Sequence, residues 1–345
     1  DYLLKKNKTI LLIEYPLDYK QSHQMRVSQL TYNETKPLYY TPVFIRVSVI
    51  SWIIEFFLTL TTISRYSAVG GVIITGDPLA TLPAILLRKA GMFKFHYYHS
   101  IDYSTKRFKN PLLNSLYTKI LKMGLKSADL VGVVSRPAVD RLAREGVKRT
   151  IFIPNSMDYH SLDKIRKSVA QRKHGNLVIT CSEVSNKYLI KDLVVLTQKL
   201  KEKYESIHLD VVGRFDSNST YCKELTNYVN SNNLQDTITF HGQVDREANY
   251  QIISQSYIGL AFYDGLHSHV MFGDALKIRE YSAFGLPTVA DSHTPTAVEM
   301  DEVSAGFTVS GFNEAYNKID SLLSDINAYN RVSECALRWA KKFDK

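Results

Sequence analysis

Cysteine is scarce in this sequence. The 345 residues contain three, Cys181, Cys222 and Cys335, which are widely spaced and odd in number. A disulfide framework needs paired cysteines and a structural zinc site needs clustered ones, so the sequence excludes both. This usage is typical of a reduced compartment, and we therefore expect a cytoplasmic protein.

Long uninterrupted hydrophobic runs are also missing. The first apolar run, residues 10–13, ends at Glu14 and is too short for the core of a signal peptide. Residues 43–66 resemble a membrane segment, but Arg46 and Glu55 interrupt them. A spanning helix needs about twenty apolar residues with few charges. We therefore favour a buried or surface-docked helix, with an interfacial membrane helix and a true span as the alternatives.

Acidic residues are few in the first half of the chain. The net charge is +9, but residues 1–160 carry 22 cations against 11 anions and residues 161–345 carry 21 against 23. This asymmetry predicts an anionic partner for the first half, such as a membrane surface, a phosphorylated substrate or nucleic acid. No nucleic-acid recognition module is evident, so we expect no nucleic-acid partner. Lys119, Lys122 and Lys126 share one face of an expected helix, which is either part of this basic surface or a solvated face.

Short apolar and β-branched runs alternate with longer helical patterns. The expected strands are residues 9–15, 71–76, 94–99, 130–135, 150–155, 177–182, 207–213, 237–242, 258–263 and 287–290. This alternation predicts an α/β protein with parallel sheets covered on both faces, in which residues 9–15 form a buried first strand.

Turn residues at 154–158 mark the expected domain boundary. We predict a basic N-terminal Rossmann-like domain (1–158), a linker (159–171), a C-terminal Rossmann-like domain (172–325) and a last helix (326–345) that packs on either domain. Because ligands bind beyond the carboxyl ends of the strands in doubly wound sheets, candidate site residues are those that follow each strand.

Residues 273–290, GDALKIREYSAFGLPTVA, carry the strongest signal. Asp274 is expected to cap a helix that ends before Gly285. Lys277 and Glu280 are not explained by the helix ends. A helix N-terminus stabilises anions such as a diphosphate, to which Lys277 could add charge, and Glu280 could accept hydrogen bonds from a ribose diol. Arg279 is expected to point elsewhere.

The pattern Lys277-x-x-Glu280-Tyr281-x-x-x-Gly285-x-Pro287 resembles the nucleotide-sugar signature of GT-B glycosyltransferases, especially retaining family 4. Residues 127–131, 153–158 and 240–244 are similar to further parts of that family at lower specificity. The resemblance implies an α/β GT-B fold, in which two doubly wound Rossmann-like domains have parallel sheets that face an interdomain cleft. No Asp-x-Asp occurs, which argues against the metal-dependent class with the other common fold, so we expect no metal and no cofactor.

The resemblance also implies a donor site. Glu280 would hold the ribose, the backbone of Ala275 and Leu276 would receive the diphosphate, and His241 and Gly242 would meet the base. Lys187, Lys191 and Arg214 are the candidates to neutralise the diphosphate, with ordinary surface cations as the alternative. The family commonly has a first Glu eight positions before Glu280, where this chain has Phe272; Asp274 or Asp264 would then take over, and retention is weakened as an expectation.

The acceptor side of the resemblance falls on His99 and Asp102, after the third expected strand. An acceptor hydroxyl often needs a base within hydrogen-bond reach, so these two are the catalytic candidates, with a structural role as the alternative. The further acceptor-binding candidates are His23 and Arg26 in the first βα loop, Tyr103 and Arg107.

The sequence therefore predicts a glycosyltransferase that uses a nucleotide-diphosphate sugar and a glycan or lipid-linked acceptor, with retention. It would be cytoplasmic, with peripheral binding to the inner face of a membrane. A nucleotide-sugar 2-epimerase of the same fold and a degenerate, non-catalytic scaffold are the alternatives.

Overall fold

The structure is a computed structural model that divides into two compact units. The first unit comprises Asp1–Ile101, Thr105–Val133 and Arg141–Ile151, and the second comprises Asp102–Ser104, Val134–Asp140 and Phe152–Lys345. The structure describes residues 5, 9–15, 24–32, 34–42, 48–67, 69–101, 103–104, 108, 110–265 and 268–345.

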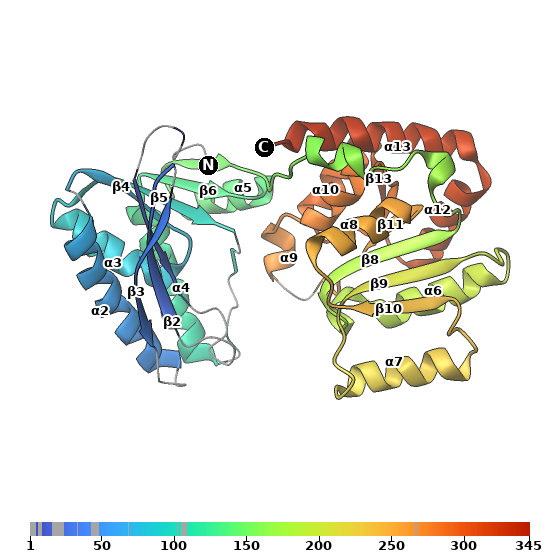
Figure 1. Cartoon of the computed structure of the whole chain (residues 1–345), viewed down its shortest axis with the longest axis horizontal. Coiled ribbons are helices and arrows are strands. Elements are labelled where there is room, and N and C mark those ends of the chain that lie inside the picture. The colour runs from blue at the N-terminus through green and yellow to red at the C-terminus, as the bar shows by residue number, and fades with distance from the viewer. Residues whose placement is uncertain are drawn as a thin grey trace. The chain divides into compact units, whose positions relative to one another are not determined.

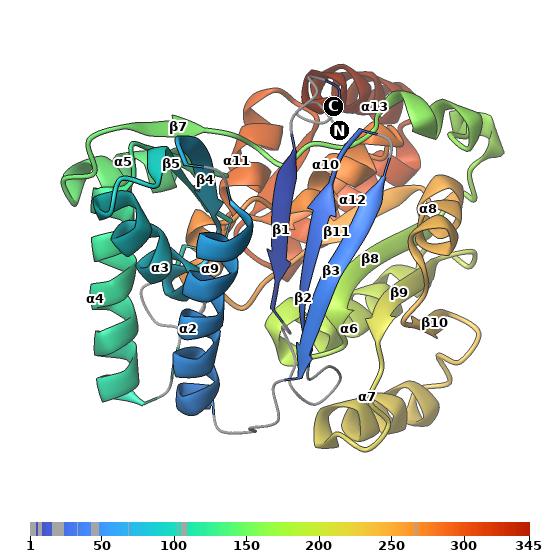
Figure 2. The same ribbon diagram turned by 60° about the vertical axis from the view of Figure 1, so that its left-hand side comes forward.

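The first unit contains two sheets. The antiparallel sheet has the order β1-β2-β3, and the other has the order β4-β5-β6-β7 with parallel β4–β5 and β5–β6 pairs. The strands are β1 (Ile10–Glu14), β2 (Gln24–Leu30), β3 (Thr35–Pro42), β4 (Gly71–Thr75), β5 (Phe93–Ser100), β6 (Leu130–Val133) and β7 (Thr150–Phe152). The helices are α2 (Ser48–Tyr66), α3 (Pro78–Lys89), α4 (Pro111–Ser127) and α5 (Arg136–Arg144), the last of which crosses into the second unit. Figure 2 shows β1, β2 and β3 side by side.

The prediction of a buried first strand in a parallel sheet is wrong. Strand β1 pairs with β2 in antiparallel register, Ile10 opposite Leu30, and its Leu12 is exposed. Met25 and Val27 of β2 are buried on one face of this sheet, where Leu58 of α2 packs against them. An antiparallel sheet can keep one face on the core and leave the other in water, which is why β1 needs no second cover.

Residues 48–66 form helix α2, as the favoured interpretation of the 43–66 segment predicted, while residues 43–47 lie outside the described residues. Glu55 and Thr59 are buried on its inner side. No helix among the described residues has both the length and the apolarity that crossing a bilayer requires.

The second unit is a doubly wound α/β domain around a six-stranded sheet. All the described strand pairs are parallel, in the order β10-β9-β8-β11-β12-β13. The strands are β8 (Asn176–Glu183), β9 (His208–Arg214), β10 (Ile238–Gly242), β11 (Ile258–Ala261), β12 (Thr288–Asp291) and β13 (Gly306–Val309). The helices are α6 (Ile190–Lys201), α7 (Thr220–Ser231), α8 (Arg246–Gln255), α9 (Ser268–Phe272), α10 (Leu276–Ala283), α11 (Pro295–Glu302), α12 (Phe312–Ser324) and α13 (Ile326–Ala340). Short 3₁₀ turns lie at His160–Lys164, Val169–Gln171, Asn186–Tyr188 and Lys341–Phe343.

Alternate residues of β8 are buried on opposite faces of this sheet, because helices cover both faces. Leu177 and Ile179 belong to the main core with α6 and α12, whereas Val178 packs with Ile253 of α8 and Tyr281 of α10. Helices on both faces are visible in Figure 1. The chain reverses its winding between β8 and β11, and this reversal is the point at which such sheets bind ligands. The last helix, α13, packs on α10 and α12 of this unit.

Candidate functional site

Helix α10 begins one residue later than predicted. Its N-cap is Ala275, which has no side chain to bond the first turn, so the prediction that Asp274 caps this helix is wrong. The prediction that the helix ends before Gly285 is confirmed. Gly285 follows the helix with a φ of +70°, a left-handed conformation that favours glycine. Pro287 then prevents continuation.

Asp274 forms a buried ion pair with Arg279. The Asp274 carboxylate accepts from Arg279 Nε at 2.8 Å, from the backbone N–H of Asn155 at 2.7 Å and from Thr296 Oγ1 at 2.7 Å. Arg279 also donates to Glu299, which confirms that it points away from Lys277. Because N–H and O–H groups of the protein already surround the Asp274 carboxylate, the arrangement supports a role in positioning α10. It does not favour a direct contact between Asp274 and a nucleotide sugar.

The side chain of Lys277 lies near the carboxyl ends of β8 and β11, where the sheet reverses its winding. Its Nζ atom is out of contact with solvent and has no hydrogen-bond partner among the described residues. It lies 4.4 Å from the ring centroid of Tyr188, after β8, and 4.9 Å from that of Tyr263, after β11. Burial, followed by repulsion from Lys187, lowers the pKa of Lys277 to about 8. A buried ammonium group is costly unless an anion accompanies it.

Glu280 follows Lys277 on the same side of α10. Its carboxylate accepts from the Tyr250 hydroxyl at 3.1 Å, and Arg246 Nε donates to that hydroxyl at 2.8 Å. Burial raises the pKa of Glu280, and the charges of Arg246 and Lys277 act against that rise. The structure therefore brings Lys277 and Glu280 together, with Arg246 and Tyr250 as supporting residues that the sequence analysis missed.

The two predicted backbone contacts for the diphosphate differ in this structure. The N–H of Ala275 donates to Thr296 Oγ1 at 2.8 Å. This N–H group is therefore already hydrogen-bonded, contrary to the prediction that it binds the diphosphate. Leu276 is the first residue of α10, and the first N–H groups of a helix have no acceptor within the helix. The backbone N–H groups of Leu276 and Lys277, in the first turn of α10, are therefore the ones left without an acceptor inside the helix.

The three predicted cations beyond β8 and β9 lie in different environments. Lys187 is in the turn after β8, and its carbonyl accepts from the Asp264 amide at 3.0 Å, which ties this turn to the loop after β11. Arg214, at the end of β9, pairs with Glu183 at 2.6 Å with both side chains exposed. Lys191 is exposed in the first turn of α6. Of the three, Lys187 is the one whose charge acts on Lys277.

His241 and Gly242 end strand β10. His241 Nε2 lies 2.6 Å from Asp210 Oδ1, so the imidazole is turned toward the sheet. Burial alone would raise the pKa of Asp210, but hydrogen bonds from His208, His241 and Asn176 lower it to about 2. Gly242 has a φ of +69° and no atom within 4 Å of the position of a side chain, which leaves open space at this strand end.

Phe272, in the position of the expected first glutamate, is the last residue of α9. Its carbonyl accepts from Ser135 Oγ at 2.7 Å, and its ring packs edge-on against Tyr103 with centroids 5.2 Å apart. Tyr103 is 3% exposed, and this burial does not favour the predicted acceptor contact at Tyr103. An aromatic pair fills the space that the resemblance assigned to a carboxylate.

The remaining acceptor-side candidates belong to other elements. His99 is the residue before the last one of β5, and its Nδ1 is hydrogen-bonded to the Tyr97 hydroxyl. Arg26 lies within strand β2, not in the predicted βα loop. Asp102, His23 and Arg107 lie outside the described residues.

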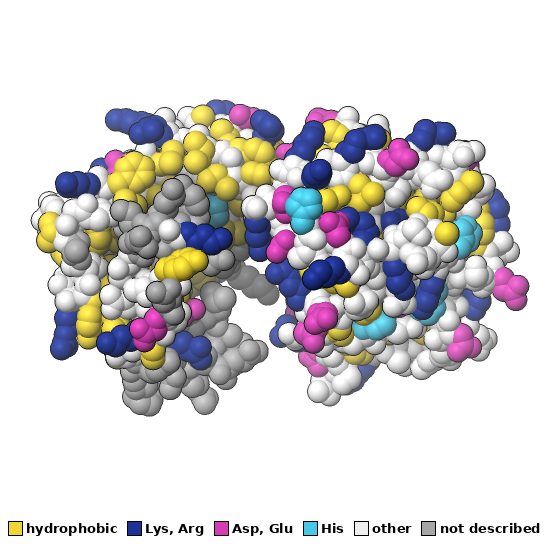
Figure 3. Space-filling model, turned by 45° about the horizontal axis from the view of Figure 1, so that its top comes forward, with side chains coloured by type: hydrophobic (Ala, Val, Ile, Leu, Met, Phe, Trp, Pro, Cys, Tyr) yellow, Lys and Arg dark blue, Asp and Glu magenta, His cyan; other side chains and the backbone are white. Residues whose placement is uncertain are grey.

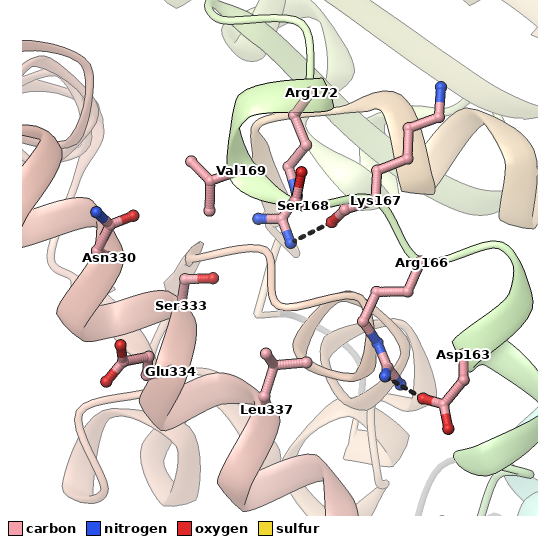
Figure 4. Close-up of a pocket in the computed structure, with 10 residues that line it drawn as sticks. All are labelled: Asp163, Arg166, Lys167, Ser168, Val169, Arg172, Asn330, Ser333, Glu334 and Leu337. Atoms are coloured by element: carbon pink, nitrogen blue, oxygen red, sulfur yellow. Dashed lines mark hydrogen bonds and ion pairs between the residues drawn. The ribbon is translucent and has the colours of Figure 1, made fainter.

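A cavity of about 370 Å³ lies on a different part of the second unit, between the segment that precedes β8 and helix α13 (Figure 4). It is lined by Asp163, Arg166, Lys167, Ser168, Val169, Arg172, Asn330, Ser333, Glu334 and Leu337. Arg172 donates to the carbonyls of Phe284 and Gly285 at the C-terminal end of α10, where carbonyl groups lack partners within the helix. Ser333 Oγ also donates to the Gly285 carbonyl, at 2.6 Å. The cavity is therefore at the opposite end of α10 from Lys277. The described residues contain no group of three or more His, Cys, Asp or Glu arranged to hold a metal ion.

Comparisons with known proteins identify the family of this chain. The family model described as glycosyl transferases group 1 matches residues 161–339, more than half of the chain. A comparison with curated protein sequences finds no match.

Three solved structures illustrate the similarity in fold. Sucrose-phosphate synthase from Thermosynechococcus elongatus has a TM-score of 0.65 at 18% identity and covers 88% of this chain and 77% of its own. Anabaena HepE, in complex with UDP and glucose, has a TM-score of 0.64 at 16% identity, with 84% and 77% covered. A trehalose-6-phosphate synthase studied for glycosyl transfer with retention has a TM-score of 0.65 at 15% identity, with 87% and 77% covered. The chain has the GT-B fold and belongs to the group 1 glycosyltransferases.

Proposed function

We propose that this protein transfers a sugar from a nucleotide-diphosphate sugar, bound at the carboxyl edge of the six-stranded sheet, to an acceptor hydroxyl. The buried, unpartnered Nζ of Lys277 carries this proposal. A protein that keeps an ammonium group away from water and without a carboxylate pays for it, and the bound diphosphate supplies the missing counter-charge.

Each neighbouring group then has a role. The N–H of Leu276 and the positive end of α10 receive the diphosphate oxygens beside Lys277. Lys187, in the turn after β8, adds a second positive charge. Glu280, oriented by Tyr250, accepts from the ribose hydroxyls. The open strand end at Gly242 admits the base.

The reaction breaks the bond between the anomeric carbon and the diphosphate oxygen, which leaves with the electron pair. The acceptor oxygen forms the new bond to the anomeric carbon and passes its proton to a base, either an acceptor-side carboxylate such as Asp102 or the departing diphosphate. The negative charge that develops on the diphosphate is stabilised by Lys277 and the α10 N-terminus. We propose retention of configuration, which is supported by the trehalose-6-phosphate synthase of similar fold, and we keep His99 and Asp102 as the acceptor-side residues.

We further propose a lipid-linked or membrane-proximal acceptor, and peripheral binding to the cytoplasmic face of an anionic membrane. Fifteen of the 21 large hydrophobic side chains that are exposed in the described residues belong to the first unit. Hydrophobic side chains also gather on that unit in Figure 3. The same half of the sequence carries the excess of positive charge, and apolar area together with cations is what an anionic bilayer attracts.

Donor binding tests the proposal directly. Nucleotide-diphosphate sugars are screened for an increase in the melting temperature, and the best one is then tested with Glu280→Ala and with the exposed control Glu334→Ala on α13. We expect the shift to disappear in Glu280→Ala and to persist in Glu334→Ala. An equal shift in both variants would remove Glu280 from the donor site.

Turnover separates an enzyme from a nucleotide-binding scaffold. We expect slow hydrolysis of the stabilising donor in the absence of acceptor, detected as released nucleoside diphosphate. Binding without any release, with or without acceptor, would favour the scaffold instead.

A further inference from the structure

Tyr97 and His99 form a hydrogen-bonded pair on one face of strand β5. Residues two apart on a strand point to the same side, and here the Tyr97 hydroxyl lies 2.8 Å from His99 Nδ1. The two ring centroids are 5.8 Å apart, with the planes inclined by 33°. Tyr98, between them, points to the opposite face and is buried.

Gly132 on the neighbouring strand makes this pair possible. Gly132 lies directly opposite His99 in the β5–β6 register. A Cβ atom at position 132 would fall 2.0 Å from the Tyr97 hydroxyl and 3.1 Å from His99 Nδ1. Any side chain there would displace the tyrosine. Glycine weakens a strand interior and often marks a site of close approach, and the group that approaches here is the Tyr97 hydroxyl.

The hydrogen bond has a preferred direction. Burial raises the pKa of Tyr97 and lowers the pKa of His99, so both side chains are neutral near pH 7. A neutral imidazole has one N–H donor and one acceptor nitrogen. The phenol is the more acidic of the two neutral groups and is therefore the better donor, so its O–H points at Nδ1 and the imidazole proton resides on Nε2.

We propose that Tyr97 is a positioning residue that fixes His99 in the tautomer with the proton on Nε2, so that His99 acts as a hydrogen-bond donor to an oxygen atom of the sugar acceptor and not as a general base. The proposal rests on the proposed function for the contact between His99 and the substrates. It leaves removal of the acceptor proton to another group, such as Asp102 or the departing diphosphate.

Nitrogen-15 NMR of the protein labelled at its ten histidines tests the tautomer without any substrate. His99→Gln identifies the signals of His99. We expect a protonated Nε2 and an unprotonated Nδ1 in the wild type, and a mixture of tautomers in Tyr97→Phe. The control Tyr98→Phe makes the same chemical change on the opposite face of β5 and leaves the His99 signals unchanged. A wild-type His99 that carries its proton on Nδ1 would overturn the proposal.

Kinetics provide a second readout if the glycosyltransferase activity is found. We expect Tyr97→Phe to raise the acceptor KM several-fold, about the value of one hydrogen bond, with donor binding unchanged. His99→Gln, which retains a donor N–H, should keep more activity than His99→Ala. Equal losses in Gln and Ala would favour a base and contradict the donor role.

Gly132→Ala gives an independent variant. The new methyl group excludes the Tyr97 hydroxyl from its place, so the His99 signals should resemble those of Tyr97→Phe. An unchanged His99 spectrum in a folded Gly132→Ala protein would show that Gly132 does not make room for the pair. Because the NMR results need no substrate, they fail or succeed separately from the proposed function.

Discussion

Arg279 and Asp274 form an ion pair across the first turn of α10, with Nε and Oδ1 2.8 Å apart and side chains that are 1% and 0% exposed. The Arg279 guanidinium also lies 3.8 Å from the ring centroid of Phe343, near the end of the chain. The ion pair therefore fixes the loop that leads into α10, and with it the position of Lys277 and Glu280.

Removing one partner of this pair should destabilise the protein strongly. Asp274→Asn leaves the Arg279 charge buried without its main partner, a change that costs about 3–5 kcal/mol in comparable cases. Urea unfolding would measure it as a lower midpoint. Glu299→Gln is the matched control, since Glu299 is 20% exposed and lies 3.3 Å from Arg279, and we expect a loss of about 1 kcal/mol. Equal losses would mean that Asp274 is not the main partner.

Lys277→Met should stabilise the empty protein and abolish donor binding. Methionine fits beside Tyr188 and Tyr263 without a buried charge, so we expect the free energy of unfolding to rise by roughly 1 to 3 kcal/mol. The melting temperature should then no longer respond to the nucleotide sugar that stabilises the wild type. Lys191→Met, at an exposed position, serves as the control. A variant that is less stable than the wild type and still binds donor would contradict the role of Lys277.

The lowered pKa of Lys277 predicts a dependence of stability on pH. In the unfolded chain a lysine has a pKa of about 10.4, whereas in the folded protein this one has a pKa of about 8. Between these values the unfolded state binds more protons, so stability rises with pH. Below pH 8 the lysine is protonated in both states, and the buried charge then destabilises the folded protein by its full amount. The rise should appear in the difference between wild-type and Lys277→Met unfolding curves from pH 8 to 10; a flat difference would mean that Lys277 is not buried as a cation.

Several elements could be predicted from the sequence because local signals define them. All ten expected strands occur in the structure, and the α10 stop at Gly285 follows from backbone geometry alone. Strands β2 and β3 were missed since their inward residues, such as Met25 and Val27, alternate with polar ones and form no apolar run. The alternation of period two was the available signal.

The misplaced site residues depend on partners far away in the sequence. Asp274 has the residue type of a helix cap, but its partners include Asn155 and Thr296, which no local pattern reveals. Tyr103 follows a strand end like a ligand residue, yet its ring is buried on Phe272. Tyr188 and Tyr263 also follow strand ends, and that position was the signal that could have identified them beside Lys277.

The exposed face of α4 gives the last prediction. At 100° per residue, Leu112, Leu116 and Met123 lie within about 40° of one another, on the side opposite the buried Leu121 and Leu125. An exposed stripe of lysines, Lys119, Lys122 and Lys126, runs beside them, and the helix contains no acidic residue. A helix with a second apolar stripe and adjacent cations fits the interface of an anionic bilayer.

Leu112→Ser with Leu116→Ser should therefore weaken flotation with phosphatidylcholine vesicles that contain phosphatidylglycerol, by about tenfold or more, because two leucines no longer insert into the bilayer. Stability should hardly change, because both side chains are exposed. Leu121→Ser is the opposite control, since it unfolds the core and tests for non-specific loss. Wild-type protein that fails to float with anionic vesicles would contradict membrane docking. Vesicle binding that is unchanged in the double variant would contradict it as well. Nucleotide-sugar binding by all folded variants would show that the donor site is separate from this surface.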